Sequence, residues 1–207
     1  MAPPGFRLCL LLTRAACAHP PLEVLEAAIA GGVDCVQLRE KDARESALWT
    51  WGRELMQACD LLQVPLVVND NVEAALALGA RGVHLGQDDM HPDDARALLG
   101  RERWIGWSTH SLEQLDEAAD LEVDYAGFGP VFATPTKGYE RGLGPDHLAA
   151  ALAIARVPVV AIGGITPENA WLVPEQAAIA VSSAICTAAD PQAAAAALRA
   201  SRAAPAP

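Results

Sequence analysis

An amide and two cationic side chains alternate along one short segment of the chain. Residues 36–41 read VQLREK, so Gln37, Arg39 and Lys41 occupy every second position. In a β-strand these three would share one face, because successive side chains point to opposite sides. Together they suit a multiply charged oxyanion, since each hydrogen bond to a charged group contributes roughly 1.5–3 kcal/mol. The triplet alone is about equally consistent with a solvated, salt-bridged strand end.

Acidic and amide side chains follow the next two apolar runs. The first run ends in VVND, which supplies Asn69 and Asp70, and the second leads into GVHLGQDD, which supplies Gln87, Asp88 and Asp89. Taken singly, Asp70 could cap the following helix, and Asp88 or Asp89 could cap or solvate the next loop. Carboxylates beside a basic triplet are better explained by a hard divalent cation, Mg²⁺, that bridges them to phosphate oxygens.

Hydroxyl groups and the second of the chain's two lysines extend this set. GWSTHS offers Ser108 as a phosphate donor, whereas His110 has no evident partner and is predicted to be structural. The loop sequence GPVFATPTKG presents Thr134, Thr136 and Lys137 as an oxyanion clamp, although a turn-forming loop would by itself explain that composition.

Small residues near the C-terminus indicate a second anion site. IGGI (162–165) and VSSAI (181–185) end two apolar runs, and glycines there would let a phosphate approach backbone N–H groups. Two anion sites suggest a diphosphate substrate and a monophosphate substrate. The sequence contains no Ser–His–Asp arrangement, acid–base carboxylate pair or metal-binding histidine pair. We therefore expect catalysis by positioning and by electrostatic help to a diphosphate leaving group.

Eight apolar segments alternate with helix-like segments and are expected to position these groups. The expected strands are 7–13, 35–39, 65–69, 82–86, 104–108, 125–129, 158–163 and 178–183. The expected helices are 22–30, 44–60, 72–78, 92–99, 112–119, 146–156, 167–172 and 191–201, with capping hydroxyls in SLEQ (111–114) and TPEN (166–169).

Strands apolar enough to be covered on both faces imply a parallel sheet of an α/β protein. Eight units close most economically as a single, compact (β/α)8 TIM barrel over residues 1–200, with 201–207 as a disordered tail. An open doubly wound sheet is the alternative, but the chain lacks the G-x-G-x-x-G opening of a dinucleotide binder.

Composition narrows the class of protein. The chain has 207 residues, 52% of them hydrophobic, and a formal net charge of −11. That charge argues against nucleic acid and acidic membranes as partners, and no apolar run approaches the roughly 20 residues of a membrane helix. The run from Leu8 to Leu12 is shorter than the roughly 7–15 residues of a signal-peptide core. We expect a cytoplasmic protein whose five cysteines are reduced, either as a monomer or as a homo-oligomer.

Seven motifs, in their order and spacing, resemble those of the thiamine-phosphate synthase family. They are VQLREK, VVND, GVHLGQDD, GWSTHS, GFGPVFATPTK, VVAIGGI and VSSAI. The resemblance covers Leu8 to about residue 198. It implies a transferase that joins a hydroxymethylpyrimidine diphosphate to a thiazole phosphate with Mg²⁺ and releases diphosphate. The implied mechanism is dissociative: diphosphate leaves first, and the thiazole nitrogen captures the pyrimidine-methyl cation.

The resemblance also implies a role for each matching residue. Diphosphate and pyrimidine ligands would be Gln37, Arg39, Lys41, Asn69, Ser108 and Lys137. The metal carboxylates would be Asp70 and Asp89. Thr134, Thr136, Gly164, Ser182 and Ser183 would hold the thiazole phosphate.

Two other functions remain open at this point. The related thiazole tautomerases carry an acid–base histidine after FG, where this chain has Pro130, and they lack the full set of anion ligands. A catalytically silent phosphate sensor on the same fold would have no reason to keep both carboxylates and both lysines.

Overall fold

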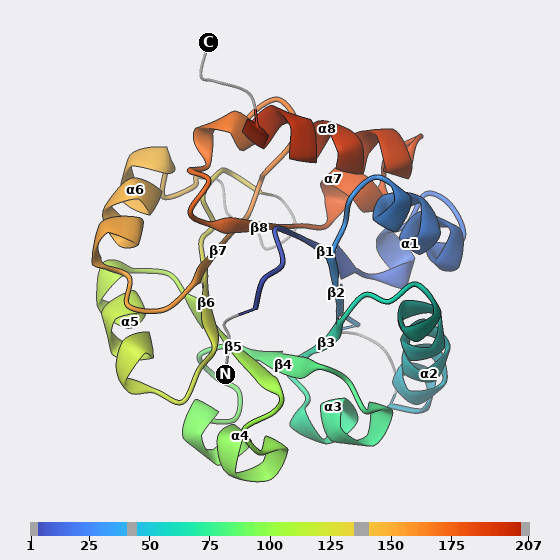
Figure 1. Cartoon of the computed structure of the whole chain (residues 1–207), viewed down its shortest axis with the longest axis horizontal. Coiled ribbons are helices and arrows are strands. Elements are labelled where there is room, and N and C mark those ends of the chain that lie inside the picture. Colours follow the sequence, from blue (N-terminus) through green and yellow to red (C-terminus); the bar gives the residue numbers. More distant parts are fainter. Residues whose placement is uncertain (1–3, 41–44, 135–140, 204–207) are drawn as a thin grey trace.

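Eight parallel strands form a closed barrel in the computed structural model, which describes residues 4–40, 45–134 and 141–203. Each strand pairs with the next along the chain, and the eighth pairs with the first (Figure 1). The predicted (β/α)8 barrel is therefore confirmed. The strands are β1 Leu8–Leu12, β2 Cys35–Leu38, β3 Leu66–Asn69, β4 Gly82–Leu85, β5 Trp104–Thr109, β6 Tyr125–Phe128, β7 Val159–Ile162 and β8 Ala178–Val181.

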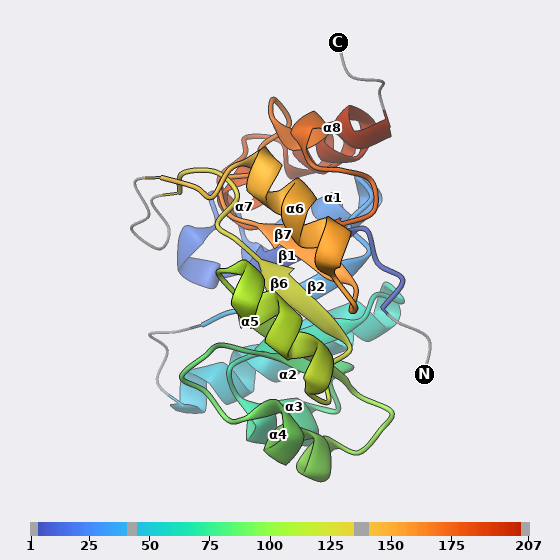
Figure 2. The same cartoon turned by 90° about the vertical axis from the view of Figure 1, so that its left-hand side faces the viewer.

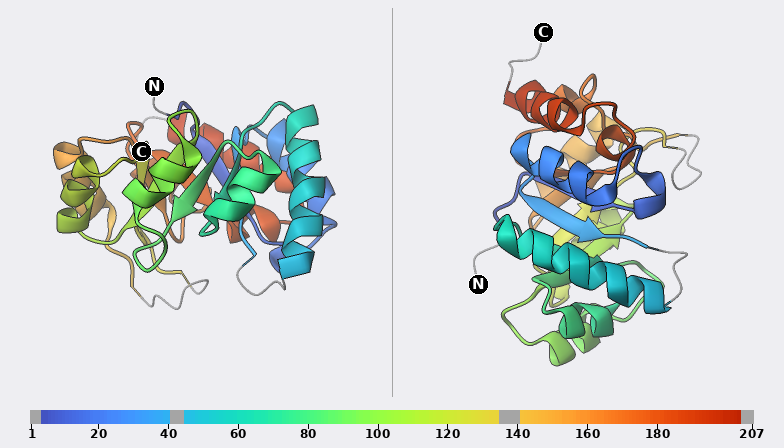
Figure 3. Two further views of the ribbon diagram at one scale, coloured as in Figure 1. Left: turned by 90° about the horizontal axis from the view of Figure 1, so that it is seen from below. Right: turned by 90° about the vertical axis from the view of Figure 1, so that its right-hand side faces the viewer.

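Helices cover the outside of the barrel. In the side views α5 and α6 lie along β6 (Figure 2), and α8, α1 and α2 follow one another along another flank (Figure 3). The described helices are α1 Pro21–Ala30, α2 Glu45–Leu61, α3 Val72–Leu78, α4 Pro92–Leu99, α5 Leu112–Glu117, α6 Pro145–Ile154, α7 Ser183–Cys186 and α8 Pro191–Ala203. Short 3₁₀ turns are η1 Arg14–Ala16, η2 Ala118–Asp120 and η4 Ala170–Leu172.

Three helical segments differ from the sequence-based expectation. The helix expected over 167–172 is reduced to the 3₁₀ turn η4, because the Asn169 side chain accepts the Thr166 N–H and donates to the Gly164 carbonyl, which closes a local turn instead. The short helix α7 was not expected. Helix α8 continues to Ala203, so residues 201–203 are helical, and the rest of the expected tail lies outside the described residues. The other predicted cap is confirmed: Ser111 accepts the N–H of Gln114.

The barrel interior is filled at one end and open at the other. Towards the N-terminal ends of the strands, Phe6, Trp104 and Tyr125 pack against one another, with ring centroids 6.0 Å and 5.7 Å from that of Phe6. Near the C-terminal ends the interior positions carry small or polar side chains, among them Gly127 and Ser108. Functional groups of such barrels occupy the C-terminal end, which here is the open one.

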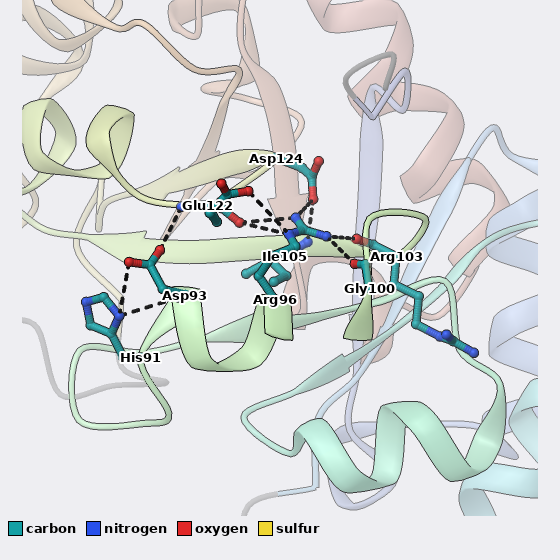
Figure 4. Close-up of polar contacts among 8 residues, drawn as sticks. All are labelled: His91, Asp93, Arg96, Gly100, Arg103, Ile105, Glu122 and Asp124. Atoms are coloured by element: carbon teal, nitrogen blue, oxygen red, sulfur yellow. Dashed lines mark hydrogen bonds and ion pairs between the residues drawn. The ribbon is translucent and has the colours of Figure 1, made fainter. Parts of the chain in front are cut away.

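The half-buried side chain of Arg96 ties the outer elements together at the closed end. The Arg96 guanidinium, on α4, donates to the carbonyls of Gly100 and Arg103 at 2.8 and 2.7 Å and to Asp124 Oδ2 at 2.6 Å (Figure 4). Asp124 Oδ2 also accepts the Ile105 N–H at 2.8 Å. One guanidinium thereby holds the loops that lead into β5 and β6.

Two expectations from composition can be compared with the structure. All five cysteines are free thiols, as predicted. Within the described ranges, none of the helices has the length and apolar character needed to cross a membrane.

Candidate functional site

A cavity of about 240 Å³ opens at the C-terminal ends of the strands. Its wall brings together seven of the predicted site residues from five parts of the chain: Gln37, Arg39, Ser108, Thr134, Gly164, Ser182 and Ser183. Strand alternation and barrel closure together account for this convergence, because interior positions at the ends of neighbouring parallel strands must meet.

The first group follows β2. Gln37 is only 5% exposed although it is polar, and both it and Arg39 line the cavity. The backbone of Arg39 is fixed on both sides: its N–H donates to the Leu12 carbonyl at 3.0 Å and its carbonyl accepts the Thr13 hydroxyl at 2.8 Å. The intervening Glu40 instead pairs with Arg14, at 3.4 Å. Arg39 forms no ion pair with any described residue.

The second group lies at the end of β5. The Gln87 amide donates to the Ser108 carbonyl at 2.5 Å, so this residue holds the strand end in place. The Ser108 hydroxyl lies 2.9 Å from His84 Nε2, and His84 Nδ1 lies 3.2 Å from the Tyr125 hydroxyl. Both His84 and Tyr125 line the cavity, and neither is among the site residues predicted from the sequence. The signal that could have found His84 is its position in GVHLG, where it alternates with Gly82 and Gly86 on the inner face of a strand.

His110 also lines the cavity. Its Nδ1 lies 2.6 Å from the Gly129 carbonyl, and its backbone N–H donates to Gln114 Oε1 at 2.7 Å. A carbonyl oxygen can only accept a hydrogen bond, so Nδ1 carries the hydrogen. The expected structural role of His110 is thus accompanied by a place on the cavity wall.

The glycines after β7 serve a close backbone approach. Gly163 and Gly164 have φ of 99° and 64°, in the left-handed region that disfavours side chains. A Cβ on Gly164 would clash with the Ala133 carbonyl, and one on Gly163 would clash with Pro130. The Phe132 N–H donates to the Gly163 carbonyl at 3.0 Å. The glycines therefore let the loop after β6 pack against β7, a requirement separate from the phosphate approach that the sequence predicts.

That packing brings the loop after β6 to the cavity. Thr134, in this loop, is buried and lines the cavity beside Gly164. Ser182 and Ser183 complete this side, where β8 gives way to α7.

Two predicted metal carboxylates follow the adjacent strands β3 and β4. Asp70 has φ of 65°, and its N–H donates to the His84 carbonyl at 2.8 Å. It does not cap α3, because Asn71 does so by accepting the Ala74 N–H at 2.8 Å. Asp89 Oδ2 accepts the Gly86 N–H at 2.6 Å, while its Oδ1 has no hydrogen bond to a described residue. Neither carboxylate lines the cavity itself, and neither does Asn69.

Any cation bound by Asp70 or Asp89 would take its remaining ligands from outside the described protein side chains. In the part of the chain that the structure describes, no three acidic, histidine or cysteine side chains are grouped closely enough to hold a metal. Mg²⁺ characteristically uses one or two carboxylates and completes its six ligands with water and substrate phosphates. Asp88 is exposed and Asp89 is half-buried. Three further predicted residues, Lys41, Thr136 and Lys137, lie outside the described residues.

Comparison with known proteins identifies the family. The sequence model of the family described as thiamine monophosphate synthase matches residues 8–185. The chain belongs to this family.

Individual relatives agree with the family match. A thiamine-phosphate synthase of Azorhizobium caulinodans is 45% identical over 172 residues, covering 82% of this chain and 81% of the relative. One from Psychrobacter sp. is 43% identical over 203 residues, 94% of each chain. The solved structure of thiamine phosphate pyrophosphorylase from Pyrococcus furiosus superposes with a TM-score of 0.85 at 34% identity, covering 96% of each chain. Thiamine-phosphate synthases are transferases, and this family member is an enzyme of that class.

Proposed function

We propose that this chain joins a hydroxymethylpyrimidine diphosphate to a thiazole phosphate, forming thiamine phosphate and diphosphate with the help of Mg²⁺. The observation that carries the proposal is the convergence of two polar groups in one cavity. Gln37 and Ser108 lie on β2 and β5 and Arg39 directly follows β2, whereas Gly164 and Ser182 follow β7 and β8. Family membership and the relatives' names support the same reaction.

The reaction requires one bond to break and one to form. The bond between the pyrimidine methylene carbon and the diphosphate oxygen breaks, and its electron pair leaves with the diphosphate. The thiazole nitrogen then donates its lone pair to the methylene carbon. Both steps are favoured by holding the partners in line and by stabilising the negative charge that grows on the leaving group.

The residues on the cavity wall can do both. Arg39 and Ser108 would donate to the diphosphate, and Gln37 would hold the pyrimidine through its buried amide. Lys41 and Lys137, predicted from sequence, would add two cations. Thr134, Thr136, Gly164, Ser182 and Ser183 would hold the thiazole phosphate. No step of this reaction needs a general base, and the polar groups on the described wall, among them Arg39 and Ser108, include hydrogen-bond donors.

Asp70 and Asp89 would hold Mg²⁺ beside the diphosphate, with Asn69 as a neighbouring ligand of the substrate. Bound there, the cation would neutralise charge on the leaving group. This arrangement would let a chain with a net charge of −11 bind a diphosphate, because the carboxylates attract the cation and the cation attracts the anion. We place the reaction in the cytoplasm, where the sequence predicts the protein to be.

The rival functions lose support. A thiazole tautomerase would need an acid–base histidine where Pro130 lines the cavity. A silent sensor would not need a cation beside a leaving group, and Mg²⁺-dependent turnover would exclude it.

The test mixes purified protein with the pyrimidine diphosphate, the thiazole phosphate and Mg²⁺, and follows thiamine phosphate by its fluorescent oxidation product. We expect product that disappears with EDTA and in Lys41→Ala. Asp89→Asn should raise the Mg²⁺ concentration needed for half-maximal rate by about tenfold or more, by analogy with the loss of a metal-site ligand or its support. The matched control Asp88→Asn should leave that concentration unchanged. Folded wild-type protein that gives no product would refute the proposal.

A further inference from the structure

Ser108 lies at the end of a hydrogen-bonded series of three polar side chains inside the barrel. The series runs from the Tyr125 hydroxyl on β6 to His84 Nδ1 on β4, 3.2 Å apart, and from His84 Nε2 to the Ser108 hydroxyl on β5, 2.9 Å apart. All three side chains line the cavity. The family resemblance accounts for the serine but leaves the other two unassigned.

The barrel makes room for this arrangement with glycines at two neighbouring positions. Strand register pairs Gly106 with both His84 and Tyr125, and pairs Gly127 with Ser108. A Cβ on Gly106 would clash with the Tyr125 hydroxyl and with His84 Nδ1, and one on Gly127 would come within 3.0 Å of the His84 ring. Large side chains thus alternate with glycines around the interior. The rings of His84 and Tyr125 meet over Gly106, with their centroids 5.5 Å apart.

The direction of each hydrogen bond follows from what lies at the two ends. A diphosphate only accepts hydrogen bonds, so a Ser108 hydroxyl that contacts it must donate its hydrogen there. The serine oxygen must then accept from His84, which requires a hydrogen on Nε2. In the neutral imidazole Nδ1 is consequently an acceptor, and the Tyr125 hydroxyl is positioned to donate to it.

We propose that His84 is a positioning residue that aims the Ser108 hydroxyl at the diphosphate, and that Tyr125 fixes the required tautomer of His84. This inference rests on the proposed function, in which Ser108 contacts the diphosphate. No proton is transferred in this role. The hydrogen bonds from Tyr125 to His84 and from His84 to Ser108 present one oriented donor to the leaving group. They also prevent the serine hydrogen from turning back towards the imidazole.

The group behind the histidine excludes a hydrolase-like role for the pair. In a nucleophilic triad a carboxylate accepts the Nδ1 hydrogen, which leaves Nε2 free to take a proton from serine. Here that group is a phenol that is 3% exposed. Burial, with smaller contributions from Cys35, Cys9 and Asp124, raises the pKa of Tyr125 well above its ordinary value, so the phenol stays protonated and can donate. The hydrogen bonds from Tyr125 through His84 to Ser108 therefore run in the direction opposite to those of a catalytic triad. Ser108 is a hydrogen-bond donor to the substrate and not a nucleophile.

Two variants of His84 separate its two nitrogens. His84→Gln places an amide near the position of Nε2, where it can still donate to Ser108. His84→Asn places an amide near Nδ1, where it can meet Tyr125 but cannot reach the serine. Both are neutral and smaller than histidine, so a general loss of packing would affect them alike. Tyr125→Phe removes only the hydroxyl.

Steady-state kinetics of thiamine phosphate formation test the positioning role. Loss of one oriented donor to a developing anion costs about 10²–10³-fold in kcat, which we expect for Ser108→Ala. His84→Asn should lower kcat by about tenfold, because the serine hydroxyl remains but is no longer aimed, with KM for the pyrimidine diphosphate changed by less than about twofold. His84→Gln should recover most of that loss. In the Ser108→Ala background, His84→Asn should cost less than about twofold more, because residues that act as a unit are not additive.

The tautomer provides a second, independent readout. In ¹⁵N spectra of protein saturated with inorganic diphosphate and Mg²⁺, the signals lost in His84→Gln identify His84. We expect a hydrogen on Nε2 and none on Nδ1, and a mixture of tautomers in Tyr125→Phe.

Each outcome bears on one claim. Three results would overturn the positioning role of His84 even if the enzyme makes thiamine phosphate. They are a hydrogen on Nδ1, a full additional loss of kcat from His84→Asn in the Ser108→Ala background, and equal losses of kcat in the Gln and Asn variants. Wild-type protein without product would refute the proposed function, while the spectra would still decide the direction of the hydrogen bonds.

Discussion

Arg96→Met should destabilise the barrel without reducing catalysis. The Arg96 side chain is 11% exposed and its partner Asp124 15% exposed. Methionine keeps most of the aliphatic stem but removes the guanidinium. The carbonyls of Gly100 and Arg103 then lose this donor, and the Asp124 carboxylate loses its ion pair while keeping the Ile105 N–H. Breaking a buried ion pair costs about 3–5 kcal/mol. The low end of that range, about 3 kcal/mol, applies here because water can reach this cluster.

Urea unfolding measures this change. With a denaturant slope of about 2 kcal/mol per molar, the midpoint should fall by about 1.5 M, and the melting temperature should fall by about 6–12 °C. The matched control is Arg156→Met. Arg156 also bonds two aspartates, but it is 52% exposed, so its midpoint should be indistinguishable from wild type.

Activity assays below the unfolding transition complete the test. Arg96 lies before β5 and β6, at the end of the barrel away from the cavity, so kcat/KM should stay within about twofold of wild type. Equal midpoints for the two arginine variants would refute the argument from burial. A large loss of kcat/KM in folded Arg96→Met would refute the separation between the two ends of the barrel.

Three further predictions concern the site and the thiols. Arg39→Met should lower kcat/KM by about 10–10²-fold through loss of a charged hydrogen bond, with an unchanged urea midpoint, and a KM effect on the thiazole phosphate alone would contradict this. Gly164→Ala should cost more than about 1 kcal/mol of stability, because its φ of 64° is strained for alanine and the new Cβ meets the Ala133 carbonyl; a midpoint equal to wild type would contradict it. Burial raises the pKa of Cys59 from its ordinary value of 9.0 to about 12, so its contribution to stability is complete below pH 9 and is lost as the pH rises towards 12. Urea midpoints at pH 8 and pH 10.5 should therefore differ less in Cys59→Val than in wild type.

The strands were predictable because each one carries its own local signal. Their apolar runs are short, bounded by polar or turn residues, and buried on both faces, so every expected strand matches an observed one to within two residues at either end. Strand alternation then placed Gln37 and Arg39 on one wall correctly, since a one-residue shift would have turned both side chains outwards. Ser108 was predicted from its place at the end of a strand, and it too lines the cavity.

The features that the sequence did not reveal depend on contacts between distant segments. TPEN has the composition of a helix start, yet the Asn169 side chain bonds the backbone on both sides and closes a turn. The meeting of His84 and Tyr125 depends on Gly106, which lies between them only once the strand register is known. Local sequence propensity predicts neither the turn at Asn169 nor the contact between His84 and Tyr125.

Tyr125 belongs both to the packed core and to the hydrogen-bonded groups of the site, so substitutions there can affect stability and catalysis together. Its ring packs edge-on against Phe6 in the closed end of the interior, while its hydroxyl reaches the polar chain that leads to Ser108. Arg96 and Arg39 lie at opposite ends of the barrel, so we expect variants of them to separate stability from turnover. At Tyr125 the two properties meet in one side chain, because its apolar face holds the core and its polar tip orients the site. Tyr125→Phe should therefore retain the stability of the aromatic packing and lose only the orientation, whereas any smaller residue there should lose both.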